Sequence, residues 1–394
     1  MAKVILNKQR RKRLEQGHPW VYKSEVAKIK GDYEAGDIVD VFNHQNHFLG
    51  KGYINPQSQM IVRILTHNDE EINEQFFIRK IEKAWQHRER FIPGVRSCRA
   101  IYGEADFLPG LVVDKYEDVL VVQIVSLGME VRKDWILKGL LEVFKPQAIY
   151  LRNDVYVREL EGLEQEKGFW YGESPTEIEI EENGVKYIVD IEDGQKTGFF
   201  FDQRENRAAI KPLITNDSTV LDCFTHTGSF MLNAYLYGAQ HVTAVDISEH
   251  AIETAKRNAA LNEFNENIDF VVANAFDYLR DAVQQGKQWD VVIVDPPAFA
   301  KSRHAVKKAY RGYKDVNLNG LKLVKEGGYF VTASCSYHVD PHMFSEMVQD
   351  AAFDAHKVLR KIHWSGAGYD HPEILGVDEG NYLKFAIYEV TSRK

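Results

Sequence analysis

The 394-residue sequence predicts an α/β protein with a doubly wound, Rossmann-like parallel sheet in its C-terminal half and a small β-barrel unit at its N-terminus. Three observations support this prediction. From residue 186 onward, apolar strand patterns alternate with helical patterns, as a parallel sheet requires. Residues 1–72 instead alternate short strand patterns with glycine turns. The chain also exceeds the roughly 250–300 residues that one hydrophobic core supports, so several domains are expected.

Composition narrows the class of protein. With 44% hydrophobic and 27% charged residues, the chain is neither disordered nor fibrous. The first thirty residues lack the apolar core of a signal peptide, and no run of ~18 apolar residues predicts a membrane span. Cys98, Cys223 and Cys335 form no CxxC pair, so we expect no disulfide framework and no metal site. These features predict a cytoplasmic protein.

Charge is concentrated at the N-terminus. Residues 1–30 hold nine Lys and Arg against two Glu, a net charge of +7, whereas the whole chain carries −9. A basic segment on an acidic body suggests a local contact with a polyanion. A solvated basic helix is the alternative, and charge alone favours neither.

The N-terminal half divides into three predicted parts. Residues 1–72 form the barrel-like unit, with strands expected at 37–42, 47–54 and 60–65. Residues 73–92 form a linker helix, because apolar side chains recur there at helical spacing. Residues 93–185 form a mixed α/β central domain, with strands at 111–113, 120–124 and 148–151 and a helix at 135–144.

Residues 186–394 form the Rossmann-like domain. Its predicted strands lie at 219–223, 241–245, 268–272, 291–294 and 328–333, and two of its helices lie at 228–237 and 249–262. In such sheets ligands bind beyond the carboxyl ends of the strands. Every chemically suggestive residue of this half lies at such an end.

The first of these strands ends in an acid, Asp222, and its turn contains a single glycine, Gly228. A pyrophosphate-binding loop needs G-x-G-x-x-G, and Asp222 would repel a pyrophosphate. An acid with one glycine suits a cationic ligand that carries an ammonium, such as S-adenosylmethionine. An ordinary strand-to-helix turn with a capping acid is the alternative.

The next two strand ends carry weaker signals. Asp246 lies 24 residues after Asp222, where its carboxylate would accept both ribose hydroxyls of a nucleoside. Asn274 would bond an adenine amino group, and Phe276 would cover the ring. Helix capping explains Asp246 and Asn274 as well.

The fourth strand leads into Asp295-Pro296-Pro297, whose carboxylate and free carbonyls would accept hydrogen bonds from a flat base. The fifth leads into Cys335, placed to add to carbon 6 of a cytosine and activate carbon 5 for methylation. A buried, inert cysteine is the alternative, and it is our interpretation of Cys223.

Upstream, three phenylalanines precede Asp202 and Glu205, a spacing that predicts a capping box at the start of a helix. Arg204 or Arg207 would meet a carboxylate or phosphate there. A hydrophobic strand that enters a charged helix is the alternative.

Together these motifs resemble those of the RlmI-like methyltransferases, class I S-adenosylmethionine-dependent enzymes that include a bacterial large-subunit rRNA cytosine-5 methyltransferase. The matching segments are Gly17–Tyr22, Gly103–Leu111, Lys196–Arg207, Asp222–Ser229, Asp295–Phe299 and Ser334–Ser336. The resemblance covers nearly the whole chain. It implies that residues 1–72 are an RNA-binding PUA domain.

The resemblance also implies the roles of the site residues. Cys335 is the expected nucleophile, with Asp295 at the methyl-transfer centre. The expected cofactor contacts are Asp222, Phe224, Thr227, Gly228, Ser229, Asp246, Ile247, Asn274, Ala275, Phe276, Asp295, Pro296 and Arg207. Where some relatives carry a Pro-Cys that helps product release, this chain has Asp295-Pro296, so Asp295 is our hypothesis for the release base.

The sequence thus predicts a methyltransferase that acts on carbon 5 of a cytosine in RNA, with large-subunit rRNA the favoured substrate. One rival is methylation of an exocyclic base amine, which Asp-Pro-Pro would support without a cysteine. Another is a non-catalytic RNA-binding or ribosome-assembly factor. The oligomeric state stays open, a homodimer being one option.

Overall fold

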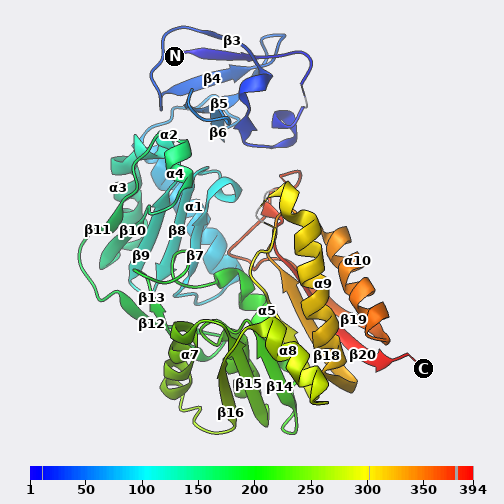
Figure 1. The fold of residues 1–394 in the computed structure, drawn as a ribbon. Coiled ribbons are helices and arrows are strands. Elements are labelled where there is room, and N and C mark those ends of the chain that lie inside the picture. The colour runs from blue at the N-terminus through cyan, green and yellow to red at the C-terminus, as the bar shows by residue number, and fades with distance from the viewer. Residues whose placement is uncertain (11, 301, 378–379, 394) are drawn as a thin grey trace. The chain divides into compact units, whose positions relative to one another are not determined.

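The computed structural model describes residues 1–10, 12–300, 302–377 and 380–393, so Arg11 of the basic N-terminal segment lies outside the described residues. Contacts divide the chain into two compact units (Figure 1). Unit 1 comprises residues 1–180, 189–201 and 369–380, and unit 2 comprises residues 181–188, 202–368 and 381–394. The predicted α/β class is confirmed. The four predicted domain spans remain predictions.

Unit 1 begins with a six-stranded sheet in the order β2-β6-β5-β4-β1-β3. Val4, Val39, Ile54 and Val62 are completely buried in its core. The three strands expected here form within two residues of their predicted bounds. The strands are β1 (Lys3–Leu6), β2 (Trp20–Val21), β3 (Val26–Lys30), β4 (Ile38–Phe42), β5 (Phe48–Ile54) and β6 (Val62–Thr66).

A five-stranded sheet in the order β11-β10-β9-β8-β7 follows in unit 1. Helix α1 (Glu74–Phe91) begins where the Asn73 side chain accepts a hydrogen bond from the Phe76 N–H, and it packs on α3. The remaining elements are β7 (Cys98–Tyr102), β8 (Leu111–Tyr116), β9 (Val119–Ile124), α2 (Leu127–Glu130), α3 (Lys133–Phe144), β10 (Ala148–Arg152), α4 (Val157–Leu160) and β11 (Lys167–Tyr171). β12 (Glu177–Glu182) and β13 (Val185–Asp190) form a hairpin, of which residues 181–188 belong to unit 2.

Buried polar contacts hold residues 369–380 to unit 1, although the chain reaches them only after most of unit 2. The Arg88 guanidinium donates to the Asp370 carbonyl over 2.8 Å and forms an ion pair with Asp106 over 2.5 Å. The Asp370 carboxylate accepts from the Arg99 N–H over 3.0 Å. All of these groups except Arg99 are buried, so they fix the segment firmly.

Unit 2 is built on a seven-stranded sheet in the order β16-β15-β14-β17-β18-β20-β19. The first five of these strands are parallel, and β20 and β19 are antiparallel additions. The order reverses at β14, which is the topological switch point of a doubly wound sheet. The strands are β14 (Thr219–Cys223), β15 (His241–Asp246), β16 (Ile268–Val272), β17 (Trp289–Val294), β18 (Val324–Ser334), β19 (Lys357–Ser365) and β20 (Lys384–Ser392).

Helices cover both faces of this sheet. One group packs together on one face: α8 (Ala275–Gln284), α9 (Val306–Lys322) and α10 (Pro341–Asp354) (Figure 1). The other group is α5 (Arg204–Ala209), α6 (Ser229–Leu236) and α7 (Glu249–Leu261). No helix in the described parts of the chain combines the length and the apolar character needed to cross a bilayer.

The predicted capping box at Asp202 is wrong. A short 3₁₀ turn, Phe201–Gln203, precedes α5, so the helix begins at Arg204 and Gln203 occupies the N-cap position. The Asp202 carboxylate instead accepts a hydrogen bond from the Tyr382 hydroxyl over 2.6 Å. The extra turn moves the start of the helix by one residue, from Gln203 to Arg204, which the spacing of acids alone did not reveal.

Candidate active site

The carboxyl ends of four parallel strands bring the predicted site residues of unit 2 to one edge of the sheet. Asp222 is the second-last residue of β14, and Asp246 is the last residue of β15. Asp295 directly follows β17, and Cys335 directly follows β18. Since β14 pairs in parallel with both β15 and β17, these ends meet at the switch point.

Asp222 is buried and lacks one partner. Its Oδ2 accepts hydrogen bonds from the Thr225 hydroxyl over 2.6 Å and from the Met231 N–H over 3.1 Å. Its Oδ1 is buried and has no hydrogen-bond partner among the residues that the structure describes. Burial, together with the charge of Asp295, raises the pKa of Asp222 to about 7. An unsatisfied buried carboxylate oxygen of this kind fits a ligand that brings an ammonium group.

Backbone angles and hydrogen bonds fix the conformation of the loop after β14. Phe224, His226 and Gly228 have φ values of 64°, 52° and 88°, in the left-handed region. The Thr225 N–H bonds to the Val245 carbonyl over 3.1 Å, and the His226 N–H bonds to Asp246 Oδ2 over 2.9 Å. The turn that contains Thr227 and Ser229 is therefore joined to β15 before any ligand binds.

Asp246 is held by backbone groups and does not cap a helix. Its Oδ1 accepts from the Ser248 N–H over 2.9 Å, and the Ser248 hydroxyl caps α7 through the Ala251 N–H. Ile247, next to it, is 69% exposed although it is apolar. The pair offers a carboxylate for ribose hydroxyls and an apolar contact for a base.

Asn274 caps a helix, which is the alternative that the sequence analysis gave for it. Its Oδ1 accepts from the Phe276 N–H over 2.9 Å and so caps α8, while Ala275 is buried. The adenine contact expected of Asn274 stays a prediction.

Four aromatic side chains lie in a row along this edge of the sheet. The ring centroids of Phe224 and Phe276 are 6.3 Å apart, those of Phe276 and Phe299 are 5.8 Å apart, and those of Phe299 and Tyr313 are 4.6 Å apart. The row joins the loop after β14 to the loop after β17. Tyr313 is fully buried, whereas Phe224, Phe276 and Phe299 are partly exposed and offer an apolar surface suited to flat rings.

Asp295 is oriented by a residue that the sequence reasoning missed. Gln203 Nε2 donates to Asp295 Oδ2 over 2.9 Å, and Gln203 Oε1 accepts from Asn206 over 2.6 Å. Gln203 directly precedes Arg204, one of the two arginines that we singled out, and an uncharged amide gave no signal of its own.

A hydroxyl network joins the Cys335 loop to the Asp295-Pro296-Pro297 loop. The Ser336 hydroxyl bonds to the Tyr313 hydroxyl over 2.7 Å and accepts from the Ala300 N–H over 3.2 Å. The Cys335 Sγ lies 4.0 Å from the Pro296 carbonyl oxygen. These contacts fix the distance between the loop that contains Cys335 and the loop that contains Asp295-Pro296-Pro297.

The three cysteines differ in exposure. Cys98 and Cys223 are fully buried, and burial raises the pKa of the Cys223 thiol well above its usual range. Cys335 is partly exposed. A thiol must be accessible to act as a nucleophile, so Cys335 is the candidate among the three.

Arg207 lies in a buried ion pair. Its guanidinium contacts Glu182 over 2.6 Å, and both side chains are 1% exposed. Arg204 also approaches Glu182, at 3.7 Å. This pairing is a structural role, and the expected cofactor contact of Arg207 stays a prediction.

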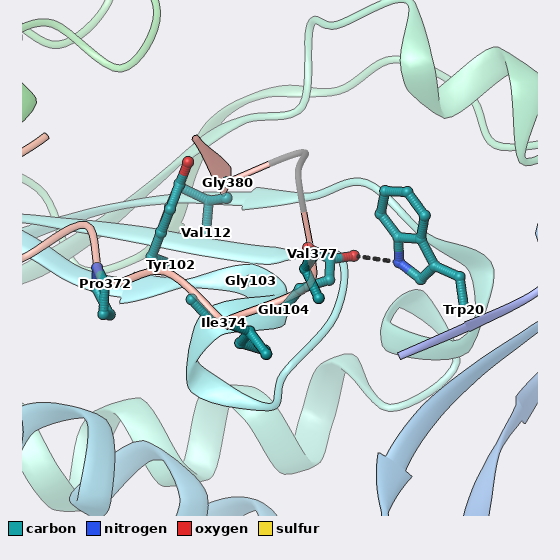
Figure 2. Close-up of a pocket in the computed structure, with 10 residues that line it drawn as sticks. Trp20, Tyr102, Gly103, Glu104, Val112, Pro372, Ile374, Val377 and Gly380 are labelled. Carbon is teal, nitrogen blue, oxygen red and sulfur yellow. Dashed lines mark hydrogen bonds between the residues drawn. The ribbon is translucent and has the colours of Figure 1, made fainter. Parts of the chain in front are cut away.

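A separate pocket of about 240 Å³ lies in unit 1 (Figure 2). Trp20 and Glu104, from two motifs quoted in the sequence analysis, meet there, and the Trp20 indole N–H donates to the Glu104 carboxylate over 2.9 Å. Pro372, Ile374 and Val377 also line it. The pocket shares no lining residue with the strand-end site.

Comparison with known proteins agrees with this geometry. Residues 4–67 match the PUA-like domain family, and residues 214–376 match a methyltransferase domain family. The chain is 41% identical over 394 residues to ribosomal RNA large subunit methyltransferase I of Alteromonas mediterranea, with 99% of each chain covered. It is 41% identical over 389 residues to the protein of that name from Vibrio parahaemolyticus, covering 97% of this chain and 98% of the relative.

Two solved structures share the fold. A protein from Streptococcus mutans described as a SAM-dependent methyltransferase superposes with a TM-score of 0.82 at 22% identity, covering 99% of this chain and 100% of that one. A methyltransferase named SMU.776, solved with SAH, superposes with a TM-score of 0.84 at 22% identity, covering 98% and 100%.

Proposed function

The chain belongs to the family of ribosomal RNA large subunit methyltransferase I, and from this premise we propose that it methylates carbon 5 of a cytosine in large-subunit ribosomal RNA. It is an S-adenosylmethionine-dependent RNA methyltransferase. The observation that carries the finer proposal is the partly exposed Cys335 thiol, directly beyond β18 and beside the Asp295-Pro296-Pro297 loop.

The strand ends fit S-adenosylmethionine, which supplies an electrophilic methyl group when bound. The unpartnered Asp222 Oδ1 would accept from its ammonium, and Asp246 would accept from its ribose hydroxyls. Ile247 and Phe276 would contact its adenine. Family membership and this retained acceptor set favour a catalyst over a non-catalytic ribosome-assembly factor.

The proposed reaction is covalent, because carbon 5 of cytosine is a poor nucleophile. The Cys335 thiolate forms a bond to carbon 6, and the electron pair of the carbon 5–carbon 6 bond moves to carbon 5. Carbon 5 then takes the methyl group as the sulfur–methyl bond breaks. A base removes the carbon 5 proton, the double bond re-forms, and the carbon–sulfur electrons return to Cys335. Asp295, oriented by Gln203, is the proposed base.

RNA would be held largely outside the reaction site. The basic N-terminal segment and the PUA-like domain would bind the phosphate backbone and the shape of the RNA. The target base would then be flipped out of its stack to reach Cys335. A cytoplasmic location, where ribosomal RNA is available, belongs to the same proposal, with the oligomeric state left open.

Transfer of labelled methyl from S-adenosylmethionine to unmodified rRNA, followed by nucleoside digestion, tests this proposal. Wild type should yield 5-methylcytidine, and Cys335→Ala should yield none. Cys98→Ala, which removes a buried cysteine in unit 1, is the control that should keep the activity. Label in an N-methylated base, unaffected by Cys335→Ala, would favour amine methylation instead.

Asp295→Asn tests the release base separately. If Asp295 removes the carbon 5 proton, this variant should accumulate a covalent protein–RNA adduct that resists denaturation. Continued turnover without an adduct would exclude Asp295 from that step.

A further inference from the structure

A buried lysine lies across the sheet from the Cys335 loop. Strands β18 and β20 pair in antiparallel register, and Lys384 is opposite Ser334, the residue before Cys335. The Lys384 side chain comes from a segment far from the strand-end motifs in the sequence, and only 1% of Lys384 is exposed. Buried lysines are rare unless they have a partner.

The hydrogen bonds of Lys384 leave its charge unpaired. Its Nζ donates to the Ser336 carbonyl over 2.7 Å and to the Tyr382 carbonyl over 2.8 Å, both neutral acceptors. Within the described ranges, no ion pair joins a carboxylate to it. An ammonium has three N–H donors, so one remains for a further acceptor. Burial lowers the pKa of Lys384 to about 8, while the nearby charges of Cys335 and Asp340 oppose that shift.

We propose that Lys384 is a positioning residue for Cys335, whose thiolate its buried ammonium stabilises while its hydrogen bond to Ser336 fixes the Cys335 loop. The proposal rests on the function above, in which Cys335 is the nucleophile. An ammonium close to a thiol favours the ionised sulfur, and that effect is strong where water is excluded.

The same charge acts on both halves of the covalent reaction. When Cys335 bonds to carbon 6, its sulfur becomes neutral and Lys384 loses its counter-charge. When the carbon–sulfur electrons return to the sulfur, the ion pair forms again. Lys384 therefore favours release of the thiolate as the leaving group, which complements removal of the carbon 5 proton.

Asp295, Asp340 and Tyr313 are titratable groups of the neighbouring elements, and Asp295 lies in the loop whose Pro296 carbonyl oxygen is 4.0 Å from the Cys335 sulfur. Asp340 lies at the start of α10, is exposed, and already accepts a hydrogen bond from the Met343 N–H over 2.8 Å. Tyr313 reaches the loop through the Ser336 hydroxyl, and burial raises the pKa of the Tyr313 phenol, so it remains neutral near pH 7. Lys384 is thus a buried cation held to the residue that follows Cys335 and paired across the sheet with the residue that precedes it.

Alkylation of the full-length protein by iodoacetamide across pH 5.5–9.5 measures the thiolate without RNA. Cys98 and Cys223 are fully buried, so the fast reaction reports Cys335, and Cys335→Ala gives the background. Wild type should react with an apparent pKa below the ordinary value of about 8.5 for cysteine. Lys384→Met should raise that value by about one unit and slow alkylation at pH 7 about tenfold.

Two further variants make the test decisive. Lys384→Arg, which keeps the positive charge, should react closer to wild type than Lys384→Met. Lys357→Met removes an ammonium from β19 opposite Ser392, at the other end of β20, and should leave the profile unchanged. SAH binding by each variant verifies its fold.

A wild-type thiol that titrates at or above about 8.5 would overturn the proposal even if Lys384→Met fails to fold. Coincident profiles for wild type and folded Lys384→Met would do the same. Because no RNA is present, a low thiol pKa that depends on Lys384 stands apart from whether the RNA product is 5-methylcytidine.

Discussion

Gln203 donates a hydrogen bond to Asp295 across 92 residues of sequence, and its own amide oxygen accepts from Asn206. The second bond fixes which end of the amide faces the carboxylate. Gln203 is buried, so water does not replace it easily. The carboxylate proposed as the release base is therefore aimed by a residue from outside the strand–helix alternation.

Gln203→Ala should lower kcat for methyl transfer. A hydrogen bond to a charged group contributes about 1.5–3 kcal/mol, equivalent to roughly a 10- to 100-fold change in rate if it acts mainly in the transition state. SAH affinity should change far less. Gln288→Ala is the matched control, because Gln288 is exposed and precedes the first residue of β17. A Gln203→Ala enzyme with wild-type kcat would exclude this role.

Cofactor binding should weaken as the pH falls through about 7. The pKa of Asp222 is raised to about 7 in the ligand-free protein, and only its ionised form pairs with an ammonium. Below that pH the Asp222 carboxyl must lose a proton before SAH binds. The Kd for SAH should therefore increase with each unit that the pH falls, by a factor that approaches ten. Isothermal titration between pH 5.5 and 8.5 measures this slope.

Asp222→Asn distinguishes protonation of Asp222 from unfolding of the protein at low pH. The variant should bind SAH weakly at every pH, with the slope abolished. A wild-type Kd that stays constant down to pH 5.5 would show that Asp222 does not meet the ammonium.

Arg207→Met should destabilise the protein. Removing one member of a buried ion pair costs about 3–5 kcal/mol, because the other charge is left buried. Arg204, 3.7 Å from Glu182, should keep the loss in the free energy of unfolding near the lower end of that range. Urea denaturation followed by circular dichroism measures it.

The double variant Glu182→Leu/Arg207→Met should recover much of the stability lost in Arg207→Met, since no charge is then stranded. SAH affinity, measured where both proteins are folded, distinguishes the two roles of Arg207. If Kd rises strongly in the recovered double variant, Arg207 contacts the cofactor as the sequence predicted.

Ile247→Ser should weaken SAH binding without loss of stability. The side chain is 69% exposed in the ligand-free protein, so folding gains little from it. Burial against adenine would contribute about 1–2 kcal/mol, and the Kd should rise roughly 5- to 30-fold. Leu375→Ser, at a position 96% exposed in unit 1, is the control. Equal affinities for wild type and Ile247→Ser would exclude the contact.

Strand ends were predictable from sequence because a parallel sheet places them together. Asp222, Asp246, Asp295 and Cys335 each follow an apolar run, and strand–helix alternation alone brings those runs into one sheet. The strand bounds agree for the same reason: β14 and β16 match the predicted residues.

The supporting residues were not predictable in this way. Gln203 comes from a 3₁₀ turn, and Lys384 comes from an antiparallel strand added beyond β18. Their contacts depend on tertiary register, which local patterns do not encode. For Arg207, the charge suggested a ligand in the sequence; the fold adds a buried partner, Glu182, which local patterns did not reveal, and the cofactor contact remains a prediction.

The position of β20 has a consequence for how the enzyme is made. β20 is the last strand in chain order, yet it lies between β18 and β19. Until residues 384–392 have left the ribosome, β18 lacks one neighbour and the Cys335 loop lacks its buried lysine. A nascent chain that has completed β14–β18 is therefore expected to lack part of the reaction centre. The protein should become catalytically active only late in synthesis, when β20 pairs with β18.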